Sequence, residues 1–405
     1  MRVLIGSSGV NLSAPGEPTG PTWTSDGPCQ DGPVHVLILG AGFAGLELAS
    51  RLSESESGEF QVTLIDRNDT FTFGFSKLDV MFGRRGADEV RLPYSEISKP
   101  GVEFRQETVT AIDPEQRRVE TDGGSYEADI LVVAMGADYD VDATPGFAEH
   151  GSEYYSVAGA DRMREVVKGF DSGRIVISIL RRPFKCPPAP FEAALLLHDH
   201  FTERGIRDRV EIETMGPMKA PVPITKSVSG EFLKALGERD IPYGAEQVVT
   251  EVGDGSAALD DGGTIEYDLF IGIPVHRVPE VVEASGLTED GWVPIDPANL
   301  RTRFERVYAL GDVAATPNPK AGAFAESAAR VVAEDIIARR TGGELEHPNQ
   351  GEGHCFLEFG GGRAGRVEVN FFGGPKPEAS LVAPTIEQAA YKEDWAAARR
   401  ERWFG

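Results

Sequence analysis

Short apolar runs of strand length, separated by amphipathic helical patterns, make up most of the chain after residue 34. Two of these runs lead within a few residues into helical patterns, at 46–52 and 191–197. Strands that alternate with helices favour parallel sheets covered by helices, because parallel strands need long crossover connections. The pattern therefore predicts an α/β protein. The runs that we interpret as strands are 35–39, 60–65, 129–135, 174–180, 209–214 and 307–312.

The two ends of the chain have different patterns. Residues 11–33 are rich in Pro, Gly, Ser and Thr, which predicts a flexible leader with Cys29 as an incidental thiol. Near the C-terminus, 356–359 and 366–372 read as strands around a glycine-rich turn, and 385–404 reads as a helix. That helix carries several aromatic residues, and packing within the protomer or against a dimer mate explains them better than membrane insertion.

The first predicted strand ends in a glycine motif, Gly40-Ala-Gly-Phe-Ala-Gly45, which opens the first predicted helix. In this context Gly40 permits a tight turn, Gly42 lets the backbone approach a pyrophosphate, and Gly45 allows close helix–strand packing. The helix N-terminus then offers free N–H groups to phosphates. Asp66 ends the second strand, 21 positions after Gly45, where a carboxylate can bind a ribose diol. These residues predict a dinucleotide site.

The charge, the length of the apolar runs and the cysteine and histidine content limit which partners and sites we expect. The 405 residues include 40 basic and 65 acidic side chains, which gives a net charge of −25. Such a surface repels nucleic acid and anionic lipid headgroups. No apolar run approaches the roughly 20 residues that a membrane-spanning helix needs, so we expect a cytoplasmic protein with at most peripheral membrane contact. Three cysteines are too few for a disulfide scaffold. No metal site is expected, because His198 and His200 point to different sides of a helix.

Cys186 lies in an unusual segment, Arg181-Arg-Pro-Phe-Lys-Cys-Pro-Pro-Ala-Pro190. Pro190 suits the first turn of a helix, so Cys186 is expected near a positive helix end, with Lys185 beside it. Both features would lower the pKa of the thiol and favour the nucleophilic thiolate. The alternative is an inert, buried cysteine in a proline corner.

Three further segments, 126–137, 307–312 and 320–326, resemble the flavin domain of the FAD-dependent pyridine nucleotide–disulfide oxidoreductase superfamily. The resemblance implies FAD as the cofactor, with Asp312 at the ribitol and Met135 replacing the threonine of an Ala-Thr-Gly motif. The helix after Lys320 would direct its N-terminus at the flavin. The residues expected to bind the cofactor are Gly40, Ala41, Gly42, Phe43, Ala44, Gly45, Asp66, Arg67, Val109, Ala134, Met135, Gly136, Gly311, Asp312, Lys320, Ala321 and Gly322.

The same resemblance implies the domain organisation. It predicts two Rossmann-like, three-layer dinucleotide-binding domains, the second inserted in the first, followed by a small α+β C-terminal unit. The expected parts are a leader (1–34), a discontinuous FAD domain (35–150 and 296–345), an insert that resembles an NAD domain and carries the redox cysteine (151–295), and a C-terminal cap or interface unit (346–405).

The expected insert lacks the usual nicotinamide motif. Its first strand, 174–180, is followed by prolines instead of G-x-G-x-x-G, and proline fixes φ and removes the amide donor. The next strand, 209–214, is followed by Met215 and Gly216, without an acid for a ribose. We infer that NAD(P)H is not the conventional electron donor.

The run Cys186-Pro-Pro-Ala-Pro-Phe-Glu192 resembles the active-site segment of sulfide:quinone oxidoreductases and flavocytochrome c sulfide dehydrogenases. The resemblance implies a redox cysteine pair beside the flavin, with Cys355 as the partner of Cys186. Hydrosulfide would open their disulfide by thiol exchange, and electrons would pass through FAD to a quinone or a redox-protein acceptor. The small sulfur substrate and the acceptor stay open at this point, as does assembly into a homodimer.

Two more residues are catalytic candidates. Glu192 matches an active-site glutamate of the sulfide dehydrogenases and is assigned an acid/base role, with a solvated helix carboxylate as the alternative. Lys320 is expected to stabilise the reduced flavin or contact the acceptor, and a surface lysine is the alternative. Two other functions remain open: an NADH:quinone or NAD(P)H-dependent disulfide reductase, and a non-catalytic flavin-binding regulatory protein.

Overall fold

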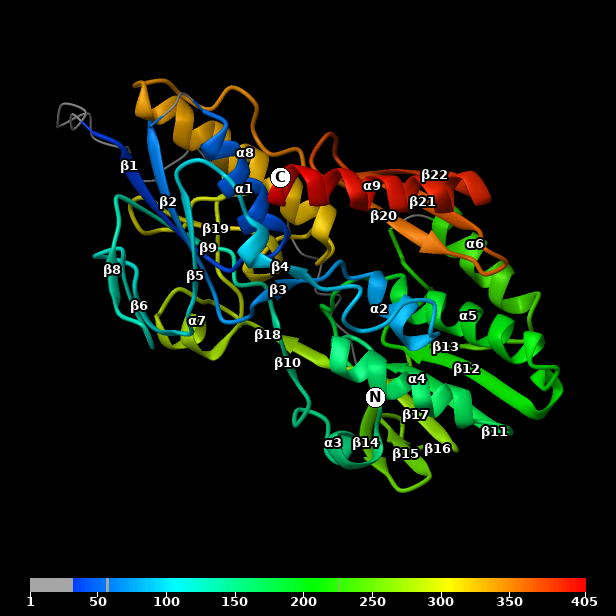
Figure 1. Ribbon diagram of the computed structural model, residues 1–405. Helices are drawn as coiled ribbons and strands as arrows, with labels where there is room; N and C mark the ends of the chain where they lie inside the picture. The colour runs from blue at the N-terminus through cyan, green and yellow to red at the C-terminus, as the bar shows by residue number, and fades with distance from the viewer. Residues whose placement is uncertain (1–31, 56–57, 225) are drawn as a thin grey trace, which may run out of the picture.

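The computed structural model describes residues 32–55, 58–224 and 226–405. Most of the expected leader, 1–34, and Cys29 therefore lie outside the described residues. Within those ranges the fold is the α/β architecture that the pattern predicts, built on two parallel sheets that lie side by side in Figure 1.

The first sheet has five parallel strands in the order β19-β9-β1-β2-β5. Alternate residues of β1 face opposite sides, so Val36 and Ile38 pack under helices α1 and α8, whereas Leu37 and Leu39 pack against the β6–β8 sheet and α7. Burial on both faces explains the continuous apolar runs in the sequence. The bounds are β1 Val34–Leu39, α1 Phe43–Ser53, β2 Phe60–Asp66, β5 Val102–Gln106, β6 Val109–Asp113, β7 Arg118–Thr121, β8 Ser125–Glu127, β9 Ile130–Val133, α7 Glu280–Ala284, β19 Val307–Ala309 and α8 Gly322–Arg340.

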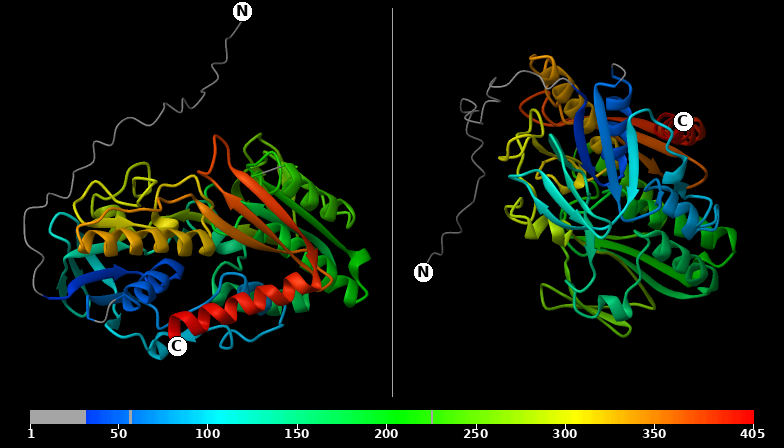
Figure 2. Two further views of the ribbon diagram at one scale, coloured as in Figure 1. Left: turned by 90° about the horizontal axis from the view of Figure 1, so that it is seen from above. Right: turned by 60° about the vertical axis from the view of Figure 1, so that its left-hand side comes forward.

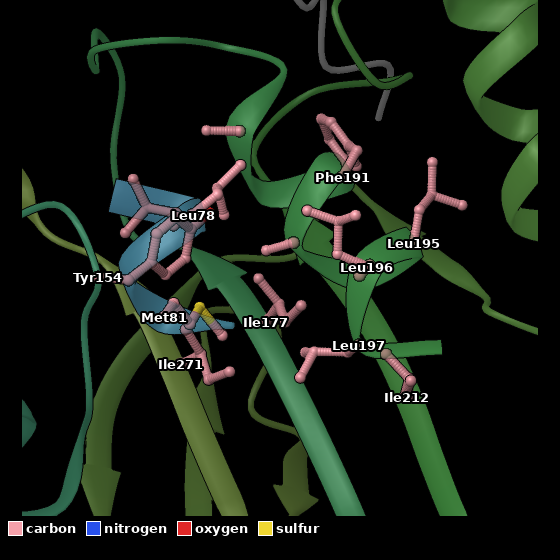
Figure 3. Packing of buried hydrophobic residues seen from close by; sticks show 14 of the residues in the cluster. Leu78, Met81, Tyr154, Ile177, Phe191, Leu195, Leu196, Leu197, Ile212 and Ile271 are labelled. Atoms are coloured by element: carbon pink, nitrogen blue, oxygen red, sulfur yellow. The ribbon is translucent and has the colours of Figure 1, made fainter. Parts of the chain in front are cut away.

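The second sheet has four parallel strands in the order β13-β12-β11-β17. One face is covered by α4, α5 and α6, and Figure 3 shows Leu197 of α5 beside Ile177 and Ile212 of the sheet. The other face packs on α3 and the β14–β16 sheet. The bounds are α3 Phe147–His150, α4 Val157–Gly169, β11 Gly173–Ile179, α5 Ala189–Glu203, β12 Val210–Gly216, α6 Lys226–Gly237, β13 Tyr243–Ala245, β14 Val249–Gly253, β15 Ser256–Leu259, β16 Thr264–Glu266 and β17 Leu269–Ile273.

Two connections join the sheets. Strands β10 (Asp138–Asp140) and β18 (Val275–Arg277) pair antiparallel where the chain enters and leaves the second sheet. Helix α2 (Ser76–Met81) belongs to the first half of the chain, yet its Leu78 and Met81 pack in the core of the second sheet beside Tyr154 (Figure 3). The remaining short elements are β3 Thr70–Phe71, β4 Leu92–Pro93, η1 Tyr94–Glu96, η2 Arg207–Arg209 and η3 Gly311–Val313.

The C-terminal segment is a three-stranded antiparallel sheet, β20-β21-β22, followed by the long helix α9. Its strands are β20 Glu352–Glu358, β21 Ala364–Asn370 and β22 Glu378–Thr385, and α9 spans Ile386–Phe404. The sequence pattern missed β22, because this edge strand has no buried residue and so no apolar alternation. Figure 2 shows α9 running along these strands to α1. There Trp403 is buried in the hydrophobic core between the first sheet and helices α1 and α8. Trp395, Trp403 and Phe404 of α9 therefore pack within the chain, whereas Tyr391 is exposed.

Among the described residues, no helix combines the length and the apolar character that a membrane crossing requires.

Candidate active site

The glycine loop between β1 and α1 has the geometry that each glycine requires. Gly40 has φ +100°, and a Cβ there would lie 2.4 Å from the carbonyl oxygen of Ala134. A Cβ on Gly45 would lie 1.9 Å from the oxygen of Gly40, so Gly45 allows α1 to approach the turn. Gly42 differs, because a Cβ there meets nothing within 4 Å and would project into open space. The backbone at Gly42 is therefore accessible to a ligand.

Two adjoining cavities lie where the strands of the first sheet end. The inner cavity, of about 410 Å³, is lined by the glycine loop, the start of α8, Cys186 and Cys355. The outer one, of about 690 Å³, shares Gly40, Asp66 and Met135 with the inner cavity. Of the cofactor residues expected from the sequence, those on the inner cavity are Gly40, Gly42, Phe43, Ala44, Asp66, Ala134, Met135, Gly136, Gly311, Asp312, Lys320, Ala321 and Gly322, while Arg67 and Val109 line the outer one.

Two expected cofactor residues line neither cavity. Ala41 is fully buried, and its N–H donates to Oδ2 of Asp66 at 2.8 Å. Gly45 packs against Gly40. Both residues therefore shape the loop: Ala41 fixes the Asp66 carboxylate at the end of β2, and Gly45 fixes the position of α1.

Two long helices begin at the inner cavity. Neither α1 nor α8 has a side chain that caps its N-terminus within the described chain, and neither carries an acidic residue in its first turn. Their first-turn N–H groups and positive dipole ends therefore suit an elongated anionic ligand. With the open backbone at Gly42, this arrangement fits FAD, whose pyrophosphate would lie at α1 and whose flavin would lie towards α8.

Lys320, just before α8, is buried and only 7% exposed, which eliminates the surface-lysine alternative. Its Nζ donates to the carbonyl oxygen of Asp312 and lies 3.4 Å from the ring centre of Trp292. Burial lowers the pKa of Lys320 to about 8. A lysine in this position can hold a positive charge, or release a proton, at the edge of the inner cavity.

Cys186 is held at the inner cavity by the loop between β11 and α5. Its backbone has φ +50°, which is uncommon for a residue with a side chain. Its N–H donates to the carbonyl oxygen of Lys320 at 2.8 Å, so the loop is anchored to the segment before α8. Cys355, in β20, lines the same cavity, and both cysteines are free thiols. Folding thus brings together two residues that lie 169 positions apart in the sequence.

The expected lowering of the Cys186 pKa is wrong. Burial and the negative charges of Glu192 and Cys355 raise the pKa of the Cys186 thiol well above its ordinary value. Burial likewise raises the pKa of Cys355 to about 12. The Nζ of Lys185 is turned away to the hydroxyl of Tyr139, at 3.3 Å, and does not compensate for the desolvation. Cys186 and Cys355 are partly exposed as residues, because they line the cavity, but protein atoms surround their thiol groups.

Glu192, in the first turn of α5, lies in the same cavity and is only 3% exposed, which eliminates a solvated carboxylate. Its Oε1 accepts from the N–H of Glu358 at 2.7 Å, so α5 is tied to β20 three residues beyond Cys355. Burial raises the pKa of Glu192 to about 8, with a further contribution from the negative charge of Glu358. A carboxyl group with this pKa can take up or release a proton near neutral pH.

An ion-pair network, centred on the buried pair of Glu358 and Lys392, lies next to Glu192. Glu358 pairs with Lys392 of α9 at 2.6 Å and with Arg84 at 2.9 Å, and Arg84 also pairs with Asp79 of α2 at 3.0 Å. The charges of Lys392 and Arg84 lower the pKa of Glu192, opposing the effect of burial. The C-terminal helix therefore contributes to the electrostatics of the cavity.

The sequence did not single out several residues of the inner cavity. Tyr139, Tyr154 and Tyr155 line it, and no motif marks them. Nε2 of His276 accepts from the N–H of Lys185 at 3.2 Å, and burial lowers the pKa of His276 to about 3. His276 is therefore a neutral support of the Cys186 loop.

The histidines considered for metal binding do not form a site. His198 bonds to Asp199 at 3.3 Å, and His200 packs against Phe82 and Phe201. In the part of the chain that the structure describes, no cluster of three or more His, Cys, Asp or Glu residues could hold a metal ion.

The residues at the start of α5 are unsuited to binding a pyrophosphate, in agreement with the absence of a nicotinamide motif there. Prolines 187, 188 and 190 remove amide donors where a Rossmann helix usually binds pyrophosphate. Buried Glu192 also places a carboxyl group in that first turn. This helix end is therefore poorly suited to the phosphates of NAD(P)H.

Comparison with known proteins agrees with this geometry. Residues 34–178 match the pyridine nucleotide-disulphide oxidoreductase family. The chain is 24% identical over 335 residues to the mitochondrial sulfide:quinone oxidoreductase of Dictyostelium discoideum, a match that covers 79% of this chain and 74% of that protein. The structure of the sulfide:quinone oxidoreductase of Aquifex aeolicus superposes with a TM-score of 0.83 at 22% identity, covering 91% and 92% of the two chains.

The chain therefore resembles the pyridine nucleotide-disulphide oxidoreductase family, and in particular the sulfide:quinone oxidoreductases. It is an FAD-dependent oxidoreductase, as the sequence predicted. The type II NADH:quinone oxidoreductase of Staphylococcus aureus is 35% identical, but over 127 residues, which are 31% of this chain and 32% of that protein.

Proposed function

We propose that this flavoprotein oxidises sulfide, or a related small sulfur species, through the Cys186–Cys355 pair and passes the electrons to a quinone or a redox protein. The observation that carries the proposal is that both thiols line one cavity with the glycine loop and the start of α8. The similarity to sulfide:quinone oxidoreductases over most of the chain supports the same substrate class.

In this proposal the two cysteines alternate between a disulfide and two thiols. Hydrosulfide attacks Sγ of Cys186 in the disulfide, the bond to Cys355 breaks, and Cys355 leaves as a thiolate with the bonding electron pair. Cys186 then carries a persulfide, whose outer sulfur is removed by a second sulfur nucleophile. The return of the two thiols to the disulfide releases two electrons, and FAD, which the glycine loop and the start of α8 would hold, would supply the redox chemistry that takes them up.

Glu192 and Lys320 have separate roles in this cycle. The ionised form of Glu192, which is present in part near its raised pKa of about 8, accepts the proton of the attacking hydrosulfide, because the residue lines the same cavity. Lys320 supplies positive charge beside Asp312 and the start of α8, where the flavin would be held. The other expected cofactor residues of the two cavities would bind the rest of FAD.

The nature of the acceptor remains part of the proposal. Several aromatic side chains, among them Phe75, Phe356 and Trp395, line the inner cavity and would suit a planar quinone. A redox protein is the alternative. The division into an FAD domain, an insert and a C-terminal unit, and the cytoplasmic location, also remain predictions.

A second candidate is an NADH:quinone reductase, which the partial match to the Staphylococcus aureus enzyme favours. The prolines and Glu192 at the start of α5 oppose it. Anaerobic mixing of the FAD-loaded protein with sulfide and, separately, with NADH distinguishes the two. We expect sulfide to bleach the flavin absorbance rapidly and NADH to bleach it slowly; rapid bleaching by NADH alone would overturn the proposal.

The cysteine pair is tested in the same assay. We expect Cys186→Ser and Cys355→Ser each to lower the rate of reduction by sulfide by about 10³-fold or more, since each removes the reacting sulfur. Cys29→Ser, at the remaining cysteine, should leave the rate unchanged and serves as the matched control. Wild-type rates in both active-site variants would overturn the role of the cysteine pair.

A further inference from the structure

Among the described residues, three lysines line the inner cavity, and two of them have partners there. Nζ of Lys320 donates to the carbonyl oxygen of Asp312. Nζ of Lys185 donates to the hydroxyl of Tyr139 at 3.3 Å and lies 4.3 Å from the centre of its ring. The third lysine is Lys77, whose Nζ has no hydrogen-bond acceptor and no ion-pair partner in the described chain. Lys77 is therefore the cation that this cavity can offer to a ligand.

Helix α2 places Lys77 at the wall of the cavity. Lys77 is the second residue of this helix and is half-buried. Leu78 and Met81 anchor the helix, because both pack in the core of the second sheet (Figure 3). Asp79, the acidic residue of the same helix, pairs with Arg84 at 3.0 Å. The negative charge of Asp79 is thus compensated by Arg84 and not by Lys77.

The acidic residues of the inner cavity also leave the charge of Lys77 available. Burial raises the pKa of Glu192 to about 8, so its carboxyl group is mostly neutral at pH 7. Asp66 accepts from a backbone N–H of the glycine loop, and Asp312 lies beside Lys320. No acid of the described chain forms an ion pair with Lys77.

The positive charge of Lys77 acts on Cys186. Burial is the largest cause that raises the pKa of the Cys186 thiol, and the charge of Lys77 opposes it. The same charge helps burial to lower the pKa of His276, which supports the Cys186 loop. A cation that favours negative charge on Cys186 also favours an anion in the same cavity, because Coulomb interactions act through space.

The charge of the whole protein makes such a cation important for an anionic substrate. The net charge of −25 repels anions at long range. An uncompensated positive charge on the wall of a cavity offsets this repulsion and raises the local concentration of a small anion. The position of Lys77 therefore suits the capture of an anion from solution.

We propose that Lys77 binds the hydrosulfide anion in the inner cavity and so supplies the anionic substrate to the Cys186–Cys355 disulfide. This inference rests on the proposed sulfide-oxidising function, and it names the residue that recruits the substrate. Lys77 makes and breaks no covalent bond. When hydrosulfide forms its bond to Sγ of Cys186, the bond to Cys355 breaks and the negative charge moves to the Cys355 thiolate, so the total charge beside Lys77 is unchanged.

The test compares Lys77→Met and Lys77→Arg with the wild-type protein, each loaded with FAD, in the anaerobic reduction of the flavin by sulfide. We expect Lys77→Met to raise the KM for sulfide about tenfold or more, because a charged cleft raises the association rate of an oppositely charged substrate by about 10- to 10³-fold. The limiting rate at saturating sulfide should change little, since the effect is on binding. Lys77→Arg keeps the charge and should keep a KM close to that of the wild-type protein.

Bromide gives a second readout that does not depend on sulfur chemistry. This non-reducing anion should compete with sulfide in the wild-type protein, and about tenfold more weakly in Lys77→Met at the same ionic strength. Lys234→Met is the matched control variant. It removes the same charge from an exposed position of α6 that lines neither cavity, and should change neither the KM nor the inhibition by bromide.

The possible outcomes separate the two proposals. Wild-type flavin that sulfide does not reduce would overturn both the proposed function and the role of Lys77. Rapid reduction of the wild-type protein, with an unchanged KM and unchanged bromide inhibition in Lys77→Met, would overturn the role of Lys77 alone. The same rise in KM in Lys77→Arg, or loss of FAD from Lys77→Met, would also overturn it, because Lys77 would then act through its shape or by holding the cofactor.

Discussion

At the scale of single residues, burial decides the chemistry of Cys186, Glu192 and Lys320. The sequence identified all three residues, but it misjudged the pKa of Cys186, because helix position and Lys185 are only local influences. In the folded chain, desolvation and the charge of Glu192 outweigh them. The alternatives of a surface lysine and a solvated carboxylate fail for the same reason, since both side chains are buried by elements distant in sequence.

Glu192 leads to a prediction about stability and pH. Its pKa is about 8 in the folded protein and near 4.5 when unfolded, so between these values the folded state holds a proton that the unfolded state releases. Stability should therefore fall as pH rises from about 4.5 to 8, by on the order of a few kcal/mol from this group. Glu192→Gln should remove that part of the fall, as measured by urea unfolding at pH 5, 6.5 and 8.

The matched control for this measurement is Glu231→Gln, at an exposed position of α6. It should retain the wild-type dependence of unfolding free energy on pH. If Glu192→Gln gives the same pH dependence as the wild-type protein, Glu192 is ionised throughout this range, and its assignment as a proton acceptor with a raised pKa is wrong.

At the scale of elements, helix α9 is a structural support for the site. Trp395, Trp403 and Phe404 pack into the core of the first sheet, and Lys392 forms the buried pair with Glu358, whose N–H donates to Glu192. The sequence predicted this helix and favoured packing within the protomer or against a dimer mate over membrane insertion. It did not predict the buried lysine, because Lys392 acquires a partner only when β20 packs under α9.

We therefore expect Lys392→Ala to be strongly destabilising. The substitution leaves Glu358 buried with Arg84 as its remaining cation, and breaking a buried pair from one side costs about 3–5 kcal/mol. The free energy of unfolding in urea measures this effect. Asp394→Ala, two residues away at an exposed position of the same helix, should change stability by less than about 0.5 kcal/mol. Equal effects of the two variants would contradict the role of the ion pair.

At the scale of the whole molecule, the candidate active site lies where three parts of the chain meet. Residues of the first sheet, the β11–α5 loop and the C-terminal strands meet at one cavity, and the bond from Cys186 to Lys320 joins the two sheets there. A ligand in this cavity contacts all three parts of the chain, and it can do so only when the protein is folded. Binding of FAD should therefore stabilise the complete structure.

This expectation can be measured by unfolding the FAD-free protein with and without added FAD. At a free FAD concentration 100 times its Kd, the free energy of unfolding should rise by about 2.7 kcal/mol. Gly42→Ala should keep the stability of the FAD-free protein, since its Cβ meets no protein atom within 4 Å, but should lose this gain at the same FAD concentration. Full FAD stabilisation of Gly42→Ala would show that the phosphates bind elsewhere.

The amino-acid sequence by itself determined the local features of this protein. Strand length, the glycine turn at Gly40–Gly45 and the helix that follows depend on neighbouring residues, because φ, amide donors and hydrophobic periodicity are local properties. The prolines after Cys186 likewise exclude a glycine phosphate loop wherever the segment lies.

The tertiary structure alone decided which distant groups meet and how deeply they are buried. The placement of Cys355 and Cys186 in one cavity and the raised pKa of Glu192 both depend on packing between elements far apart in the chain. Desolvation and Coulomb interactions act through space, so no spacing in the sequence contains them.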